Sequence, residues 1–359
     1  MALDAERVRA PLERFLAQAL GEDACRIARM TRLAGGTVQD NWYLEVEAGA
    51  AGAPAHGSEA IRLVLRTGRV VGTKDSLPAE HEYAVLCTAA KAGVRVPQPV
   101  AVCGDPGVIG RPFFVMAFVD GESRPWKLQR MPEVMAAGDA ILEEIGAELA
   151  RLQTITPGGS EGLGFLKPPP RDAAREAIAD MRAYLDTHDH PHPAIEYALR
   201  WLERHAPAPG AVVLCHGDFR FGNVTIAAAK LTSILDWELT RWGDPYESLA
   251  WFCMRFFRFA RPDLVAGGLG SRAALLRGWQ AVSGRVPDPA AIRYWDIMAN
   301  ARWAVISLQQ VGREVFGGEN SLELALVGLA TGEMELEALS LIQRADARAD
   351  AHNGTEQAP

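Results

Sequence analysis

Cysteines are few in this sequence, and their spacing is not that of a cross-linked or zinc-binding protein. There are five of them and no two form a CxxC pair: Cys25, Cys87, Cys103, Cys215 and Cys253. Disulfide frameworks usually need an even number of cysteines, and structural zinc sites need short spacings. We therefore expect reduced thiols and a cytoplasmic protein.

Long apolar runs and an excess of basic residues are lacking as well. No stretch approaches the roughly 20 apolar residues that a membrane-spanning helix requires. Asp4, Glu6 and Arg7 interrupt the N-terminal segment, unlike the apolar core of a signal peptide. Acidic residues outnumber basic ones, 45 to 37, which gives a net charge of −8, whereas a nucleic-acid-binding protein normally carries a basic face. The sequence therefore predicts neither a membrane nor a nucleic-acid partner.

The first third of the chain has the pattern of an antiparallel sheet with helices packed on it. Apolar residues recur at helical spacing in two segments and at strand spacing in five. The predicted helices are Leu3–Leu20 and Pro78–Gly93, and the predicted strands are Arg26–Leu33, Asn41–Glu47, Ile61–Arg66, Pro99–Cys103 and Phe113–Val119. Consecutive strands joined by short turns should pair antiparallel.

Helical spacing dominates after Gly121. The predicted helices are Val134–Leu152, Arg171–Asp186, His192–His205, Tyr246–Phe259, Ser271–Ser283, Pro289–Val311 and Ser321–Ala345. The chain therefore predicts an α+β fold with two lobes: a β-rich lobe of residues 1–119, a larger helical lobe of residues 120–345, and a disordered tail of residues 346–359. A cleft between two such lobes is a common place for a nucleotide.

The segment 212–251 contains two apolar, strand-like runs that flank a polar turn. The first run leads into the tripeptide HGD at 216–218, Asn223 follows five positions after Asp218, and the second run ends at Asp236. We expect the two strands to return side by side, which would bring the three polar side chains together. Phosphoryl transfer needs a carboxylate at the acceptor hydroxyl and hard oxygen ligands for Mg²⁺. The segment therefore predicts one base and two magnesium ligands.

The strings HGD-x4-N, ILDWE and GDP resemble the catalytic core of the aminoglycoside phosphotransferase family, which includes choline-kinase-like enzymes. These enzymes are relatives of protein kinases, whose corresponding motifs are HRD-x4-N and DFG. The resemblance implies a bilobal, protein-kinase-like fold that uses ATP and Mg²⁺. It makes Asp218 the catalytic base, His216 the residue that supports the loop, and Asn223 and Asp236 the metal ligands. Gly217 replaces the arginine of protein kinases, which favours a small-molecule substrate.

The resemblance also assigns residues in the N-terminal lobe to the nucleotide. Gly35 and Gly36 would form the turn over the phosphates between the first two strands. Arg66, at the end of the third strand, would contact the α- and β-phosphates and pair with Glu82 on the following helix. Many relatives have lysine where this chain has Arg66, but arginine keeps its charge and contacts phosphate in a bidentate way. Lys74 is a second candidate for this cation.

The strand FFVMAFVDG resembles the hinge of the family. The carbonyl group of Ala117 and the amide of Val119 would bind the adenine edge, and Met116 would border the adenine pocket. Asp244 precedes a proline and a predicted helix, which favours a helix cap. The resemblance implies that this aspartate braces the catalytic loop, and both roles are structural and not catalytic. Glu238 could line the substrate cleft or form a salt bridge.

The resemblance implies a small-molecule acceptor, and the later helices bear on its chemistry. The later helices carry aromatic residues at helical spacing, which is typical of a core, and no dense acidic patch for a polyamine. HGDFRFGN, ILDWE and VPQPVAVCGDPGVIGRPFFVMAFVDG look most like the branch of the family associated with acyl-CoA dehydrogenases. That resemblance implies a hydroxyacyl-CoA-type acceptor rather than an aminoglycoside. A catalytically silent, nucleotide-binding pseudokinase is the alternative, although all three polar residues are present.

Overall fold

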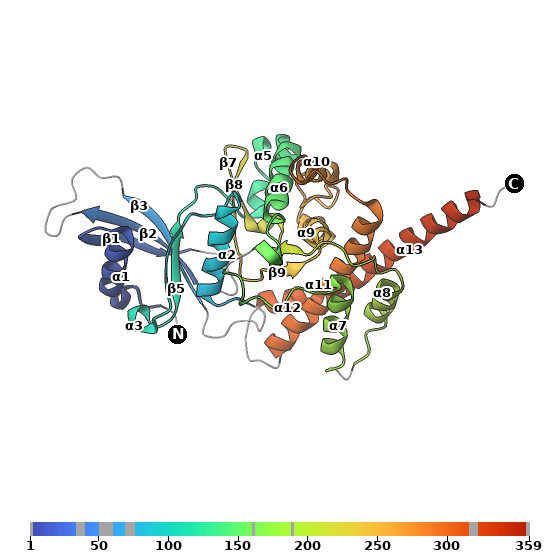
Figure 1. Cartoon of the computed structure of the whole chain (residues 1–359), viewed down its shortest axis with the longest axis horizontal. Coiled ribbons are helices and arrows are strands. Elements are labelled where there is room, and N and C mark those ends of the chain that lie inside the picture. The colour runs from blue at the N-terminus through green and yellow to red at the C-terminus, as the bar shows by residue number, and fades with distance from the viewer. Residues whose placement is uncertain are drawn as a thin grey trace.

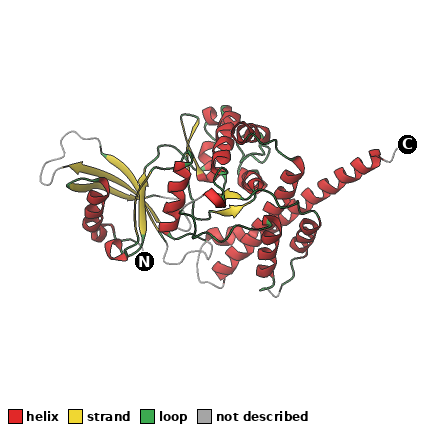
Figure 2. Ribbon diagram, in the orientation of Figure 1, coloured by secondary structure: helices red, strands yellow, loops and turns green. Residues whose placement is uncertain are grey.

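A computed structural model describes residues 3–33, 40–49, 60–68, 76–159, 162–187, 190–315 and 322–356. Figure 1 shows the strands of one sheet at one end of the molecule and most of the helices at the other. The same division is visible in Figure 2, where strands and helices are coloured separately. This arrangement confirms the predicted α+β class.

The N-terminal lobe is built on a five-stranded antiparallel sheet in the order β1-β2-β3-β5-β4. Its strands are β1 (Ala24–Arg32), β2 (Asp40–Gly49), β3 (Ile61–Thr67), β4 (Pro99–Cys103) and β5 (Phe113–Ala117). Three helices accompany it: α1 (Ala5–Leu20), α2 (Ala79–Lys91) and the short α3 (Pro106–Ile109). All seven longer elements that the sequence predicts in this lobe are present.

The side chains of β5 alternate between the two faces of this sheet. Phe113 and Val115 belong to the core that the sheet shares with α1, whereas Phe114 belongs to the core that includes α2 and the helical lobe. Successive strand residues point to opposite faces, so one strand contributes to both cores. The sheet is thereby fixed between α1 on one side and α2 with the helical lobe on the other.

The C-terminal lobe consists mainly of helices. They are α4 (Pro125–Leu128), α5 (Pro132–Ala136), α6 (Gly138–Leu152), α7 (Ala173–Leu185), α8 (Pro193–Arg204), α9 (Pro245–Phe252), α10 (Arg272–Ser283), α11 (Pro289–Val315), α12 (Leu322–Leu329) and α13 (Thr331–Glu356), with single 3-10 turns at Pro157–Gly159, Phe221–Asn223 and Arg255–Arg258. Within the described residues, no helix is both long enough and apolar enough to cross a membrane.

The helical lobe has two hydrophobic cores. One joins α6, α10 and α2, and the other joins α7, α8, α9, α11 and α13. The aromatic stripe noted in the sequence belongs to these cores, since Trp279, Tyr294 and Trp295 are all buried. Trp279 Nε1 also donates to Gln153 Oε1 at 2.8 Å, and Gln153 Nε2 donates to the carbonyl group of Pro245 at 2.7 Å.

Four short strands, not two, surround the HGD motif. β6 (Val213–Cys215) pairs with β9 (Arg241–Gly243), and β7 (Val224–Ala227) pairs with β8 (Lys230–Ile234). The prediction that the two apolar runs return side by side is therefore wrong. The tight turn that joins β7 to β8 has positive φ at Ala228 and Ala229. Alanine gives no sequence signal for such a turn, and β9 is too short to show a period.

Three predicted helices are interrupted, and one runs further than expected. Val134–Leu152 divides into α5 and α6, Tyr246–Phe259 ends as α9 before a 3-10 turn, and Ser321–Ala345 divides into α12 and α13. Helix α13 continues to Glu356, so residues 346–356 are helical where the sequence predicts a disordered tail. The apolar period runs through each break, so periodicity alone does not reveal where one helix stops.

Candidate active site

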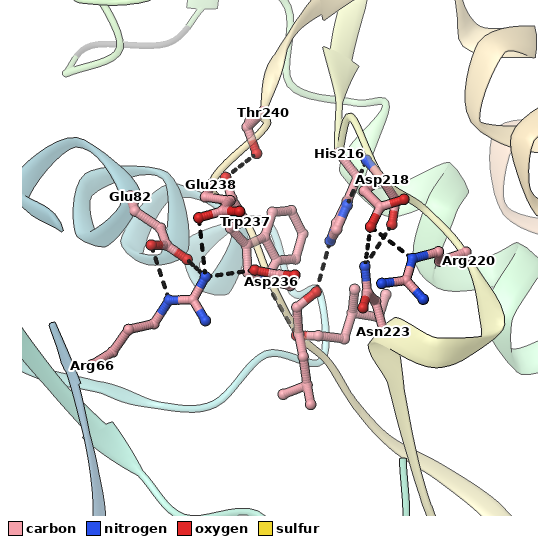
Figure 3. Close-up of polar contacts among 12 residues, drawn as sticks. Arg66, Glu82, His216, Asp218, Arg220, Asn223, Asp236, Trp237, Glu238 and Thr240 are labelled. Atoms are coloured by element: carbon pink, nitrogen blue, oxygen red, sulfur yellow. Dashed lines mark hydrogen bonds and ion pairs between the residues drawn. The ribbon is translucent and has the colours of Figure 1, made fainter. Parts of the chain in front are cut away.

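His216 connects the HGD loop to the strand end that precedes Asp236. Its side chain is completely buried, and its Nε2 lies 2.9 Å from the carbonyl oxygen of Leu235. A carbonyl oxygen only accepts, so Nε2 carries the proton and Nδ1 accepts from the amide of Asp218 at 3.3 Å. Burial lowers the pKa of His216, which keeps the ring neutral. His216 thus holds the two segments together (Figure 3).

Gly217 has a local reason to be glycine. Its φ is +87°, in the left-handed region that side chains disfavour. A Cβ added there would also clash with the backbone carbonyl of Leu239. The absence of an arginine at this position is therefore dictated by the close approach of a neighbouring chain segment.

The carboxylate of Asp218 accepts hydrogen bonds on both of its oxygens. Oδ1 accepts from Trp251 Nε1 at 3.0 Å, and Oδ2 accepts from Arg220 Nε at 2.7 Å and from Asn223 Nδ2 at 2.8 Å. Burial by itself would raise the pKa of Asp218, but the charge of Arg220 and the hydrogen bonds from Arg220 and Trp251 lower it below its usual value. The group is therefore ionised near neutral pH.

Asn223 lies directly beside Asp218 and is also tied to the segment before Asp236. Its Nδ2 donates to the backbone carbonyl of Asp218 at 2.9 Å, and its own backbone carbonyl accepts from the amide of Leu235 at 2.8 Å. Because the amide nitrogen faces Asp218, the amide oxygen of Asn223 points elsewhere. The structure thus brings Asp218, Asn223 and Asp236 together through side-chain and backbone bonds, not through the strand pairing that the sequence predicts.

Arg66 reaches Asp236 from the other lobe. Its Nη2 lies 2.5 Å from Asp236 Oδ1 and 2.8 Å from Glu82 Oε1, and its Nε donates to Glu82 Oε2 at 3.0 Å. Arg66 and Glu82 are almost completely buried, while the side chain of Asp236 is 33% exposed. Burial opposes the charge on Arg66, but the carboxylates around it raise its pKa above the ordinary value. The predicted pairing of Arg66 with Glu82 is present.

The backbone of Asp236 is unusual. Its φ is +70°, and non-glycine residues seldom adopt positive φ. Glu238, two residues on, is buried and lies 4.0 Å from Arg66 Nη2. Of the two roles that the sequence leaves open for Glu238, the structure places it in a salt bridge.

Asp244 caps helix α9. Its Oδ1 accepts from the amide of Tyr246 at 2.8 Å, and Glu247 Oε1 accepts from the amide of Asp244 at 3.2 Å, which completes a capping box. Burial raises the pKa of Asp244 to about 7. These contacts agree with the structural role expected from the sequence.

The remaining predicted nucleotide residues lie at the end of β5 or outside the described residues. Met116 and Ala117 end β5, and the amide of Ala117 donates to the carbonyl group of Gln98 at 2.8 Å. Val119 follows in the segment that leads to the helical lobe. Gly35, Gly36 and Lys74 fall outside the described ranges.

The donor set suits a hard cation. Asp236 offers a partly exposed carboxylate, and Asn223 offers an amide oxygen that faces away from Asp218. Mg²⁺ typically takes one or two protein oxygens and completes its shell with phosphate oxygens and water. In the described part of the chain, no three His, Cys, Asp or Glu side chains gather as a metal site. The residues present fit Mg²⁺ better than a metal that needs an all-protein shell.

Arg220 and Trp251 are the contacts of Asp218 that sequence reasoning missed. Arg220 lies two residues after Asp218, so its position in the HGD-x4-N motif is the signal that could have found it. Trp251 comes from α9 and lies 33 residues away in sequence. No local pattern connects it to the loop.

A sheet lobe, a helical lobe and a carboxylate–amide cluster between them define a kinase-like protein. A model of the phosphotransferase enzyme family matches residues 29–285, more than half of the chain. The chain therefore belongs to this family, as the motifs indicated.

Two animal proteins match part of the chain. Acyl-CoA dehydrogenase family member 10 of Mus musculus is 28% identical over 181 residues, which is 50% of this chain and 17% of the relative. Acyl-CoA dehydrogenase family member 11 of Gallus gallus is 30% identical over 182 residues, 50% of this chain and 23% of the relative. The match thus spans less than a quarter of the length of these relatives.

Solved structures share the fold at lower identity. A Ralstonia eutropha protein assigned to the aminoglycoside phosphotransferases has a TM-score of 0.72 at 22% identity, covering 96% of this chain and 99% of the other. A mutant of aminoglycoside phosphotransferase APH(4)-Ia, in a ternary complex with ADP and hygromycin B, has a TM-score of 0.57 at 18% identity, covering 92% and 98%. These likenesses confirm the bilobal kinase-like fold.

Proposed function

We propose that this protein is an ATP- and Mg²⁺-dependent phosphotransferase that moves the γ-phosphoryl group onto a hydroxyl of a small molecule. The observation that carries the proposal is the juxtaposition of Asp218, Asn223 and Asp236 beside Arg66, which comes from the opposite lobe (Figure 3). This is the set of groups that phosphoryl transfer requires: a carboxylate for the acceptor, oxygen ligands for a cation, and a cation for the phosphates.

Each side chain has a defined part in this proposal. Asp218 accepts a hydrogen bond from the acceptor hydroxyl, orients it and takes its proton as the new bond to the γ-phosphorus forms and the bond from that phosphorus to ADP breaks. Asn223 and Asp236 would hold Mg²⁺, which would supply positive charge at the phosphate oxygens. Arg66, kept in place by Glu82, contacts the α- and β-phosphates. His216 positions the loop and touches neither substrate.

The nucleotide-binding lobe in this proposal comprises residues 1–119, and residues 120–345 carry the catalytic loop and the acceptor site. The adenine edge contacts the carbonyl group of Ala117 and the amide of Val119, with Met116 beside the ring. The family resemblance assigns Gly35 and Gly36 to the phosphates. The fold neighbour APH(4)-Ia is in a ternary complex with ADP and hygromycin B, which supports nucleotide binding as part of this proposal. ATP is abundant in the cytoplasm, where we place the activity.

The acceptor that we favour is a hydroxyacyl-CoA-type metabolite rather than an aminoglycoside. The support is the similarity to acyl-CoA dehydrogenase family members of two animals. Aminoglycoside phosphotransferases share the fold at no more than 22% identity among the neighbours compared above, and fold by itself does not define the acceptor.

An acceptor screen with Mg²⁺ and ATP labelled at the γ-position tests this function. We expect label transfer to a hydroxyacyl compound, and we expect Asp218→Ala to abolish transfer while ATP still binds, because Asp218 contacts the acceptor and not the nucleotide. Full turnover by Asp218→Ala would show that Asp218 is not the base. ATP binding without transfer to any acceptor would favour the alternative, a nucleotide-binding pseudokinase.

A further inference from the structure

An apolar stripe runs along the outside of helices α12 and α13. Its members are Leu322, Leu326, Leu329 and Leu336, which are 77%, 56%, 80% and 66% exposed. In the described part of the chain nine large apolar side chains are exposed, and these four lie within residues 322–336. Single exposed apolar residues are normal on a folded protein, whereas a contiguous group of them marks an interaction surface. We call this group the leucine stripe.

The four leucines share one side because the two helices follow each other almost without a break. Ala330 joins them, and the hydrogen bonding continues through it. Its amide donates to the carbonyl group of Val327 at 3.0 Å, and its carbonyl group accepts from the amide of Met334 at 3.1 Å. Three of the leucines are spaced by seven residues, which is nearly two full turns of a helix.

The opposite side of both helices packs on α11. A Cβ added at Gly328 would clash with the side chain of Val311 on α11. Met334 and Ala338 are buried in the core that includes α11. Leu336 lies midway between these two in sequence and therefore points the other way, since successive helical residues are about 100° apart. The leucine stripe is thus on the side of these helices that their own core does not use.

The spacing and the charges indicate what kind of partner fits the stripe. Apolar residues repeated every seven positions are the pattern of two helices that pack side by side. Helices that lie on anionic membranes carry lysine and arginine beside their apolar face. The first turns of α13 carry Glu333, Glu335 and Glu337 instead. The stripe therefore fits a helix of a protein better than a lipid surface.

The stripe is complementary to itself. Leu322 lies seven residues before Leu329, and Leu336 lies seven residues after it. An antiparallel second copy with Leu329 at the two-fold axis therefore places Leu322 of each copy opposite Leu336 of the other. The charges favour the same orientation. A parallel pair would set Glu333 against Glu333, whereas the antiparallel pair sets it against position 325, an alanine in the sequence.

The size of the stripe predicts a weak dimer. A leucine side chain carries roughly 60–120 Å² of apolar surface, so eight leucines at these exposures would bury roughly 300–700 Å². A stable interface buries about 1,200–2,000 Å² in total. The stripe is about 21 Å long, and side chains beside it on both helices would supply the remaining area. Dissociation in the micromolar range is therefore expected.

We propose that the leucine stripe is the contact surface of a homodimer, in which α12 and α13 of two copies pack antiparallel about Leu329. Glu333 lies 3.7 Å from Arg255 of its own chain, so dimerisation leaves this carboxylate paired. The contact uses none of the residues assigned to phosphoryl transfer, and the inference does not depend on the proposed function.

Sedimentation velocity over a range of protein concentrations tests the association. We expect the wild type to shift from monomer to dimer as its concentration rises. Leu329→Glu sets two carboxylates against each other at the axis and should raise the dissociation constant at least tenfold. Val286→Glu is the matched control, because Val286 is 77% exposed and lies outside the stripe. It should dimerise like the wild type, and both variants should unfold at nearly the wild-type temperature.

Cysteine cross-linking tests the orientation. Leu329→Cys should form an intermolecular disulfide on mild oxidation, because the two side chains meet at the axis. Leu322→Cys should not cross-link to itself, since its two copies are about 21 Å apart in the antiparallel pair. A mixture of Leu322→Cys and Leu336→Cys should cross-link. The wild type, which has five cysteines of its own, gives the background.

Three results would overturn the proposal. They are a wild type that stays monomeric at several hundred micromolar, a dimer that Leu329→Glu does not weaken, and self-cross-linking of Leu322→Cys above the wild-type background. Co-sedimentation with phosphatidylcholine vesicles supplies the remaining comparison. Vesicle binding by a monomeric wild type that Leu329→Glu abolishes and Val286→Glu retains would assign the stripe to a lipid surface instead.

Discussion

The contact between Trp251 and Asp218 leads to a prediction that depends on one hydrogen bond. Trp251→Phe removes the indole N–H and keeps an aromatic ring in the same core. Trp251 is the donor to Asp218 Oδ1, whereas Arg220 and Asn223 both donate to Oδ2. The variant therefore leaves Oδ1 without a donor and the carboxylate free to turn away from the acceptor.

The expected fall in kcat follows from the strength of a hydrogen bond to the charged carboxylate oxygen of Asp218. A hydrogen bond to a charged group contributes about 1.5–3 kcal/mol. Since about 1.4 kcal/mol is tenfold, kcat should fall between roughly tenfold and 150-fold. The lower part of this range is expected, because two donors still hold Oδ2. The affinity for ATP should be unchanged, since the proposed function has Asp218 contact the acceptor and not the nucleotide.

Trp303→Phe is a matched control. Trp303 lies on α11 with its ring centroid 5.6 Å from that of Trp251, and its Nε1 has no hydrogen-bond partner in the part of the chain that the structure describes. This variant loses the same atoms in the same core without touching Asp218. Steady-state kinetics and nucleotide titration of both variants make the test. Equal kcat values for the two variants would refute the positioning role of Trp251.

The other predictions concern the cation site and the helix cap. Asp236→Ala should weaken binding of Mg-ATP as well as turnover, and Mg²⁺ titration with nucleotide should show it; unchanged affinity would contradict the metal role. Asp244→Asn should remove a pH dependence of stability. The folded pKa of Asp244, about 7, lies above the ordinary 3.8, so its stabilising effect is complete below about pH 4 and lost as the pH rises through 7. Thermal unfolding at pH 5 and pH 8 should therefore show the wild type losing more stability than Asp244→Asn, and parallel losses would contradict the assignment.

The fold class and the site motif could be predicted because they depend on local pattern. The β-rich lobe has strands with clear alternation and helices with clear ends, such as α1, which is capped by Asp4 and terminated by Gly21 at φ +72°. HGD, Asn223 and Asp236 are fixed by spacing along the chain. Arg66 and Glu82 follow from the order of strand and helix.

The contacts that complete the site depend on segments distant in sequence, and only the tertiary structure decides them. Strand pairing around the HGD loop was wrong because β6 has β9 as its partner and the β7–β8 turn is made of alanines. Trp251 comes from α9, and no local period encodes its meeting with the HGD loop. The sequence by itself determined which groups could carry the chemistry, because residue type and spacing set the donors. Packing of the helices determined what those groups face.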